Sequence, residues 1–106
     1  MKQKLTTLLI LASLVLAAGS ASAADAGENW AKNCASCHAK DGTGNTMMGK
    51  KLGLADYTDA KAQAKFTDAE AFTAIKEGKD KMKPFKDKLT DDEIKALVAH
   101  IRSFKK

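Results

Sequence analysis

The sequence is poor in several residue types and sequence patterns that particular classes of protein require. Its 106 residues include two cysteines, two histidines, one proline and 6% aromatic residues. No stretch alternates apolar and polar residues with an excess of β-branched side chains, so we predict no β-sheet. The net charge of +5 falls to +3 without the two lysines among the first four residues, and so small an excess does not indicate nucleic-acid binding. Folds built on a sheet and nucleic-acid-binding domains are therefore disfavoured.

Long apolar runs are also lacking, and the longest one indicates export. Leu5–Ala18 is largely apolar, follows a basic start and precedes Ala21-Ser22-Ala23, an A-x-A cleavage site. A membrane span needs about 20 apolar residues, more than this run provides. We predict that residues 1–23 are a cleaved signal peptide and that residues 24–106 form one domain, soluble in the periplasm and without stable membrane insertion. An uncleaved anchor is the alternative.

The two cysteines belong to the most specific motif of the chain. Cys34-Ala35-Ser36-Cys37-His38 is a C-x-x-C-H sequence, the attachment motif of a c-type haem. Residues i and i+3 of a helical turn share a face, so both thiols can reach the two vinyl groups along one haem edge and form thioethers. His38 follows at once and can coordinate the iron from the proximal side. We therefore predict one covalently bound haem c and its iron.

Two other chemistries could use the same residues. A dithiol redox site requires a βαβ context, which a chain without predicted strands does not offer. A structural zinc ion needs four ligands, usually from paired Cys/His clusters, whereas His100 stands alone. Haem is the favoured interpretation, and zinc and dithiol chemistry are the alternatives.

Several segments have the sequence features of helices. Residues 26–33 are expected to form a short helix that leads into the haem motif, with Trp30 as a packing residue. Capping boxes at residues 67–70 and 90–93 begin two further helices, and residues 59–65 are a weaker candidate. The last helix carries one apolar stripe at helical spacing: Ile94, Leu97, Val98 and Ile101. We predict an all-α fold of about three to five short helices wrapped around the haem.

The segment between residues 39 and 53 has the composition of a loop, with four glycines among polar residues. Such a loop could wrap the haem, because glycine permits close backbone approach to a flat macrocycle. Plain turn formation explains the glycines equally well. His100 lies off the apolar stripe of the last helix, so we expect a solvated histidine rather than an iron ligand.

The loop between the two capped helices contains the candidate distal ligand. Gly78–Phe85 includes the only proline of the chain. A methionine thioether opposite the histidine raises the reduction potential and leaves no open position on the iron. Met82 is the predicted ligand, because Pro84 restricts the backbone beside it. Met47 and Met48 are weaker candidates because they follow the haem motif so closely, and an open distal position is the remaining alternative.

Together these motifs resemble a small bacterial class I cytochrome c. The resemblance rests on residues 34–38, the glycine-rich loop, Lys81-Met82-Lys83-Pro84-Phe85 and the capped amphipathic C-terminal helix. It implies a haem held by Cys34, Cys37 and His38 with Met82 distal. It also implies that the N-terminal helix crosses the C-terminal helix, and that one electron passes between larger redox complexes.

The resemblance is incomplete in the segment of sequence that follows the haem histidine. Family members often carry a proline about ten residues after it, whose region accepts the imidazole N–H. This chain has no proline before Pro84. The carbonyl of Leu52 or Gly53 is the expected acceptor instead.

A six-coordinate haem in a small fold indicates a diffusible electron carrier and not an enzyme. A haem enzyme or gas-binding cytochrome with an open distal position is the alternative, and the export signal disfavours a module cut from a larger oxidase. Residues 79–88, called the basic segment below, hold five lysines and two aspartates. We expect a monomer whose basic segment guides an acidic surface of a larger redox protein or membrane respiratory complex, although a merely solvated loop has the same composition.

Overall fold

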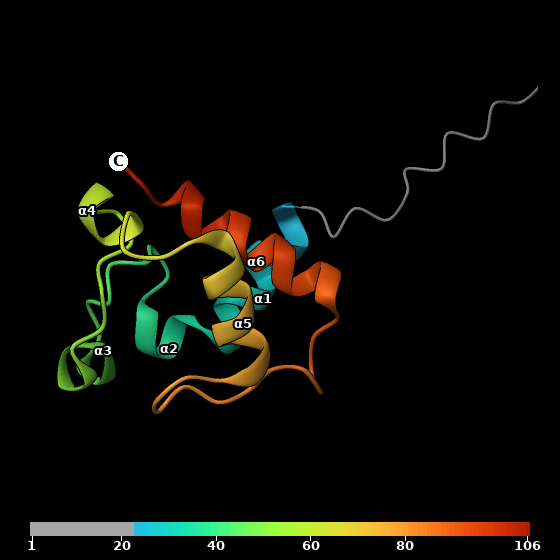
Figure 1. Ribbon diagram of the computed structural model, residues 1–106. Helices are drawn as coiled ribbons and strands as arrows, with labels where there is room; N and C mark the ends of the chain where they lie inside the picture. The colour runs from blue at the N-terminus through green and yellow to red at the C-terminus, as the bar shows by residue number, and fades with distance from the viewer. Residues whose placement is uncertain (1–22) are drawn as a thin grey trace, which may run out of the picture.

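The computed structural model describes residues 23–106, which form six helical segments around one apolar core (Figure 1). The predicted signal peptide lies outside the described residues except for Ala23. Within residues 23–106 the only β-pairing is a single antiparallel bridge between Lys79 and Met82, so the all-α prediction is confirmed. In this part of the chain no helix is both long and apolar enough to cross a membrane. The helices are α1 (Ala23–Asn33), α2 (Ala35–His38), α3 (Met47–Leu52), α4 (Ala60–Gln63), α5 (Asp68–Glu77) and α6 (Asp91–Ser103).

Both predicted capping boxes are present and begin α5 and α6. At α5 the Glu70 amide donates to the Thr67 hydroxyl at 3.1 Å, and the Thr67 amide donates back to the Glu70 carboxylate at 3.0 Å. Thr90 and Glu93 repeat this pair at α6. A side-chain cap typically contributes about 1 kcal/mol. These caps fix where α5 and α6, the two helices that flank the basic segment, begin.

The core lies where α6 packs against α1 and α5, as Figure 1 shows. The apolar stripe of α6 faces it, and Ile94 and Leu97 are fully buried. Trp30 of α1 and Ile75 of α5 complete the core from the other two helices. The expected contact between the N-terminal and C-terminal helices is confirmed.

The glycine-rich segment is not the uninterrupted loop that its composition predicts, because it contains α3. The Thr46 hydroxyl accepts a hydrogen bond from the Gly49 amide at 2.8 Å and caps the first turn. Gly53 ends the helix in the left-handed region with φ of 66°. Since both the cap and the stop are local, a six-residue helix forms although it contains Gly49.

His100 is partly buried and not solvated as expected. Its ring centroid lies 5.7 Å from that of Trp30 and 4.9 Å from that of Phe104. Phe104 follows His100 by four residues, so the two rings share one side of the chain as α6 ends. Burial lowers the pKa of His100. The ring therefore belongs to an aromatic cluster.

Candidate functional site

The haem motif continues the helical path of α1 with almost no break. The Cys34 amide donates to the Trp30 carbonyl at 2.9 Å, and the His38 amide donates to the Cys34 carbonyl at 2.9 Å. Both cysteines are unpaired thiols. The structure thus brings Cys34, Cys37 and His38 together on one turn, as the spacing predicts.

The state of the thiols argues against dithiol redox chemistry. Cys34 is 8% exposed, and burial, helped by the charge of a Cys37 thiolate, raises its pKa to about 11. Catalytic dithiols instead have a lowered thiol pKa, because the thiolate is the nucleophile. Among residues 23–106 no three His, Cys, Asp or Glu side chains converge as the ligands of a zinc ion would. The thiols therefore fit covalent attachment of a cofactor better than either alternative.

The His38 imidazole contacts two aromatic rings, which also contact each other. Its centroid is 5.5 Å from that of Trp30 and 5.4 Å from that of Tyr57, which stacks on it at an interplanar angle of 24°. Burial lowers the pKa of His38 and favours the neutral imidazole, which is the form that binds metals. Its Nδ1 atom is buried and has no hydrogen-bond partner in the described part of the chain. A neutral imidazole beside two free thiols on one helical turn suits a haem group.

The expected acceptor for the histidine N–H was wrong, because neither Leu52 nor Gly53 bonds to Nδ1. The chain after α3 approaches Gly44 instead. The Leu54 and Ala55 carbonyl oxygens lie 3.2 and 3.3 Å from the position that a Cβ at Gly44 would occupy. The chain then returns to the haem motif, where the Tyr57 amide donates to the Gly42 carbonyl at 2.8 Å and the Tyr57 ring stacks on His38.

The loop that follows the motif folds back onto it. The Gly44 amide donates to the His38 carbonyl at 2.7 Å, and the Thr46 hydroxyl donates to the Cys37 carbonyl at 2.7 Å. A Cβ at Gly49 would collide with the carbonyl oxygens of Cys37 and Gly44. The carbonyls of the haem motif are thus held by a tightly packed backbone.

We expect Gly49→Ala to lower the free energy of unfolding by about 1–3 kcal/mol, the usual cost of overpacking, because backbone must move to admit the methyl group. Chemical denaturation of the haem-loaded protein measures this loss. Gly27→Ala is the matched control, since a Cβ there meets nothing within 4 Å. Equal stability of the two variants would show that the contact at Gly49 is not tight.

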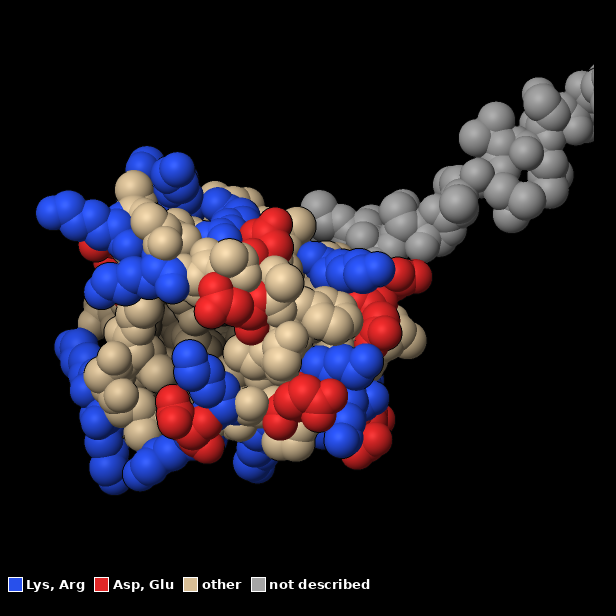
Figure 2. Space-filling model, in the orientation of Figure 1, with Lys and Arg blue, Asp and Glu red and all other residues tan. Residues whose placement is uncertain are grey.

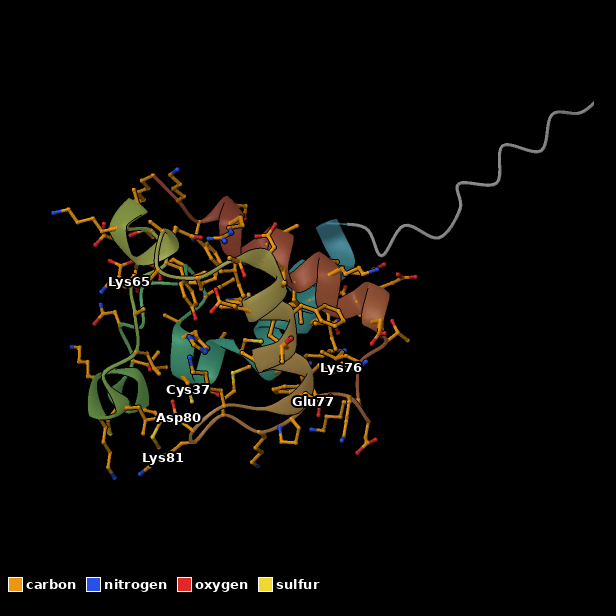
Figure 3. The ribbon with its side chains drawn as sticks, in the orientation of Figure 1. Cys37, Lys65, Lys76, Glu77, Asp80 and Lys81 are labelled. Atoms are coloured by element: carbon orange, nitrogen blue, oxygen red, sulfur yellow. The ribbon has the colours of Figure 1, made fainter. Side chains whose placement is uncertain are left out.

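Met82 lies on a hairpin anchored to the end of α5. The Lys79 and Met82 backbones exchange hydrogen bonds of 3.1 and 2.9 Å, and the Phe85 amide donates to the Ile75 carbonyl at 3.0 Å. Met82 is half-buried and packs against the core cluster that includes Cys34. In the view of Figure 3 the hairpin tip, labelled at Asp80 and Lys81, lies toward the same edge of the molecule as Cys37.

The other two candidate methionines are placed differently. Met47 is 91% exposed and Met48 is 44% exposed, and neither belongs to the core cluster or packs against it. The structure therefore associates Met82, and not the α3 pair, with the cluster that contains the haem motif.

Comparison with known proteins places this site in a family. Residues 21–101 match the family described as cytochrome C oxidase, cbb3-type, subunit III. The structure of the KustC0563 c-type cytochrome is similar, with a TM-score of 0.71 and 41% identity over 76% of this chain and 98% of that chain. A tyrosine-to-phenylalanine variant of that cytochrome gives a TM-score of 0.69, also at 41% identity, over 76% of this chain and 99% of that one. No curated protein matches. The chain therefore belongs to the cbb3-type subunit III family and is a c-type cytochrome, an electron-transfer protein with covalently bound haem c.

Proposed function

We propose that this cytochrome is a periplasmic carrier that shuttles one electron through a six-coordinate haem. In this proposal Cys34 and Cys37 are the attachment sites, His38 is the proximal ligand and Met82 is the distal ligand. The observation that carries the proposal is that Met82 packs against the core cluster to which Cys34 belongs, while Met47 faces solvent.

Each residue has a distinct part in this proposal. Held by these residues, the haem would supply one-electron redox chemistry. The neutral imidazole of His38 offers a nitrogen lone pair, and the thioether of Met82 offers a sulfur ligand that favours the reduced state. If His38 and Met82 both held the iron, no ligand position would be left for a substrate.

Carbon monoxide separates a carrier from a gas-binding cytochrome or haem enzyme. We expect the reduced protein to keep its spectrum under carbon monoxide, because Met82 occupies the distal position. Rapid formation of a carbon monoxide complex would instead indicate an open position and support the alternative function.

A fixed electron-transfer subunit is the second candidate, because the matched family is described as a subunit of an oxidase. Co-purification separates the two possibilities. A carrier should be recovered from the periplasmic fraction as a monomer that lacks residues 1–23. A subunit should instead co-purify with a membrane complex.

The basic segment supports docking to an acidic partner. In Figure 2 lysine and arginine side chains are frequent along the left and lower margins of the visible face, and acidic side chains are mixed with further basic ones across the rest of it. Lys81, Lys83 and Lys88 of the basic segment are exposed. Lys86 differs, because its ammonium lies 3.6 Å from the Glu77 carboxylate.

We expect replacement of Lys81, Lys83 and Lys88 by glutamine to slow reduction by an acidic redox protein and to flatten its salt dependence. Exposed charges steer association, and salt screens them over about 10 Å at 0.1 M. Stopped-flow rates from low to high salt measure the effect. Replacement of Lys61, Lys65 and Lys95 by glutamine is the charge-matched control. If both triple variants slow reduction by the acidic protein equally, the slowing reflects non-specific charge attraction and not docking at the basic segment.

A further inference from the structure

Met47 and Met48, called the Met pair below, are the exposed large apolar side chains of residues 23–106. Met47 is 91% exposed and Met48 is 44% exposed, whereas the other large apolar side chains in this part of the chain are buried or half-buried. A single apolar side chain on a surface is ordinary, but an apolar patch beside a functional site marks a contact with another molecule. The Met pair therefore needs an explanation.

The helix that carries the Met pair, α3, is fixed directly to the haem motif. Thr46 precedes the pair, and its hydroxyl donates to the Cys37 carbonyl at 2.7 Å. Gly49 follows the pair and packs so closely on the carbonyls of Cys37 and Gly44 that a Cβ would collide with them. In Figure 1 α3 stands beside α2 at the left edge of the molecule. Contacts on both sides of the Met pair therefore hold it at a fixed place beside the attachment site.

The charges nearest to the Met pair along the chain are positive. Lys50 and Lys51 of the same helix are exposed, and the sequence between Asp41 and Asp56 contains no acidic residue. In Figure 2 basic side chains border the outer side of this region. A surface that covers the Met pair should therefore be apolar at its centre and acidic around it. A second copy of α3 would instead bring its own lysines against these, which like-charge repulsion opposes.

We propose that the Met pair is an apolar docking contact for the redox partner, and that the partner meets it with an apolar patch bordered by carboxylates. This inference rests on the proposed function as an electron carrier, and it adds a second contact to the basic segment. Electron-transfer complexes bury less than about 1,200 Å², so two side chains form a substantial share of such an interface. Methionine is enriched at protein interfaces, and its flexible side chain adapts to surfaces of different shape. That property suits a carrier that must bind both a donor and an acceptor.

Replacing both methionines with glutamine tests this contact in the haem-loaded protein. Glutamine keeps the helix propensity and the charge but removes the apolar surface. Reduced flavodoxin, a small acidic flavoprotein, is the electron donor, and stopped-flow absorbance follows reduction of the haem. We expect the second-order rate constant to fall about fivefold or more at every salt concentration, which is the effect of losing one substantial interface contact. The slope of the rate against salt should not change, because salt screens charges and no charge has been altered.

Replacing both methionines with leucine is the matched control. Leucine remains apolar and favours a helix, so this variant should be reduced by flavodoxin at nearly the rate of the unmodified protein. Ascorbate, a small reductant that needs no protein docking, should reduce all three proteins at the same rate. The glutamine variant of Lys81, Lys83 and Lys88 should differ from the glutamine variant of the Met pair, because it flattens the salt dependence.

An unchanged rate in the glutamine variant would overturn the proposal, and so would a leucine variant that is slowed as much as the glutamine variant. A changed haem spectrum in the glutamine variant would place the Met pair against the haem and not against a partner. Gel filtration and flotation with phosphatidylcholine vesicles cover the remaining occupants. A dimer or a vesicle-bound protein that the glutamine changes release would assign the Met pair to a second copy or to lipid, and would overturn the proposal too. Failure of the proposed function would appear separately, as rapid carbon monoxide binding by the reduced, unmodified protein.

Discussion

Replacing both Cys34 and Cys37 with serine is expected to abolish haem attachment and to leave a chain without cooperative folding. The reason is that only some segments of the chain contribute large apolar side chains to the core. Its large buried side chains come from α1, α5, α6 and Leu89. Between residues 40 and 66 the fully buried residues are three glycines and Gln63, so no large apolar side chain of this segment is fully buried. The domain is also near the roughly 80-residue size below which a hydrophobic core alone gives little stability.

Circular dichroism and a thermal melt measure this coupling between attachment and folding. We expect the double variant to lose most of its helical signal and its sharp transition. Ser36→Ala is the matched control, because Ser36 is exposed within the same motif and should leave attachment intact. Native helix content and a cooperative melt in the haem-free double variant would show that the protein part folds alone.

Met82→Ala is expected to open the iron to water and added ligands and to lower the reduction potential. A thioether favours the ferrous state, so its loss should shift the potential down by on the order of 0.1–0.3 V, within the roughly 0.8 V that axial ligands span. Optical titration with an external ligand and redox potentiometry measure the two effects. The hairpin itself should persist, because its hydrogen bonds are made by backbone atoms.

Met47→Ala and Met48→Ala are the controls for this prediction. Met47 is almost fully exposed and Met48 is partly exposed on α3, so neither change should alter the spectrum. If Met82→Ala keeps methionine ligation, the distal role passes to another residue. Loss of that ligation in a Met47 or Met48 variant would identify which one.

The sequence predicted the parts of the fold that depend on neighbouring residues. The capping boxes at Thr67 and Thr90 are four-residue patterns whose hydrogen bonds close locally, and both formed as predicted. The stripe of α6 follows helical periodicity, and all four of its residues are buried. The grouping of Cys34, Cys37 and His38 follows from one helical turn.

Features that depend on distant residues were not predicted. Gln63 lies in a short segment with no apolar pattern, yet it bonds to Ile101 and Arg102 from the far end of the chain. The contact between Tyr57 and His38 joins residues 19 positions apart, which the spacing of the haem motif does not predict. The position of His100 depends on contacts with α1 and with the end of α6. Local sequence patterns do not predict the contacts of Gln63 with Ile101 and Arg102 or of His100 with Trp30, because each joins residues far apart in the chain.

The absorption spectrum of the purified protein, recorded oxidised and reduced, tests the central claim most directly. The account predicts a low-spin haem c that stays attached after denaturation, with a long-wavelength band from thioether-to-iron ligation in the oxidised form. A high-spin spectrum, or a haem that is extracted once the protein is denatured, would contradict it.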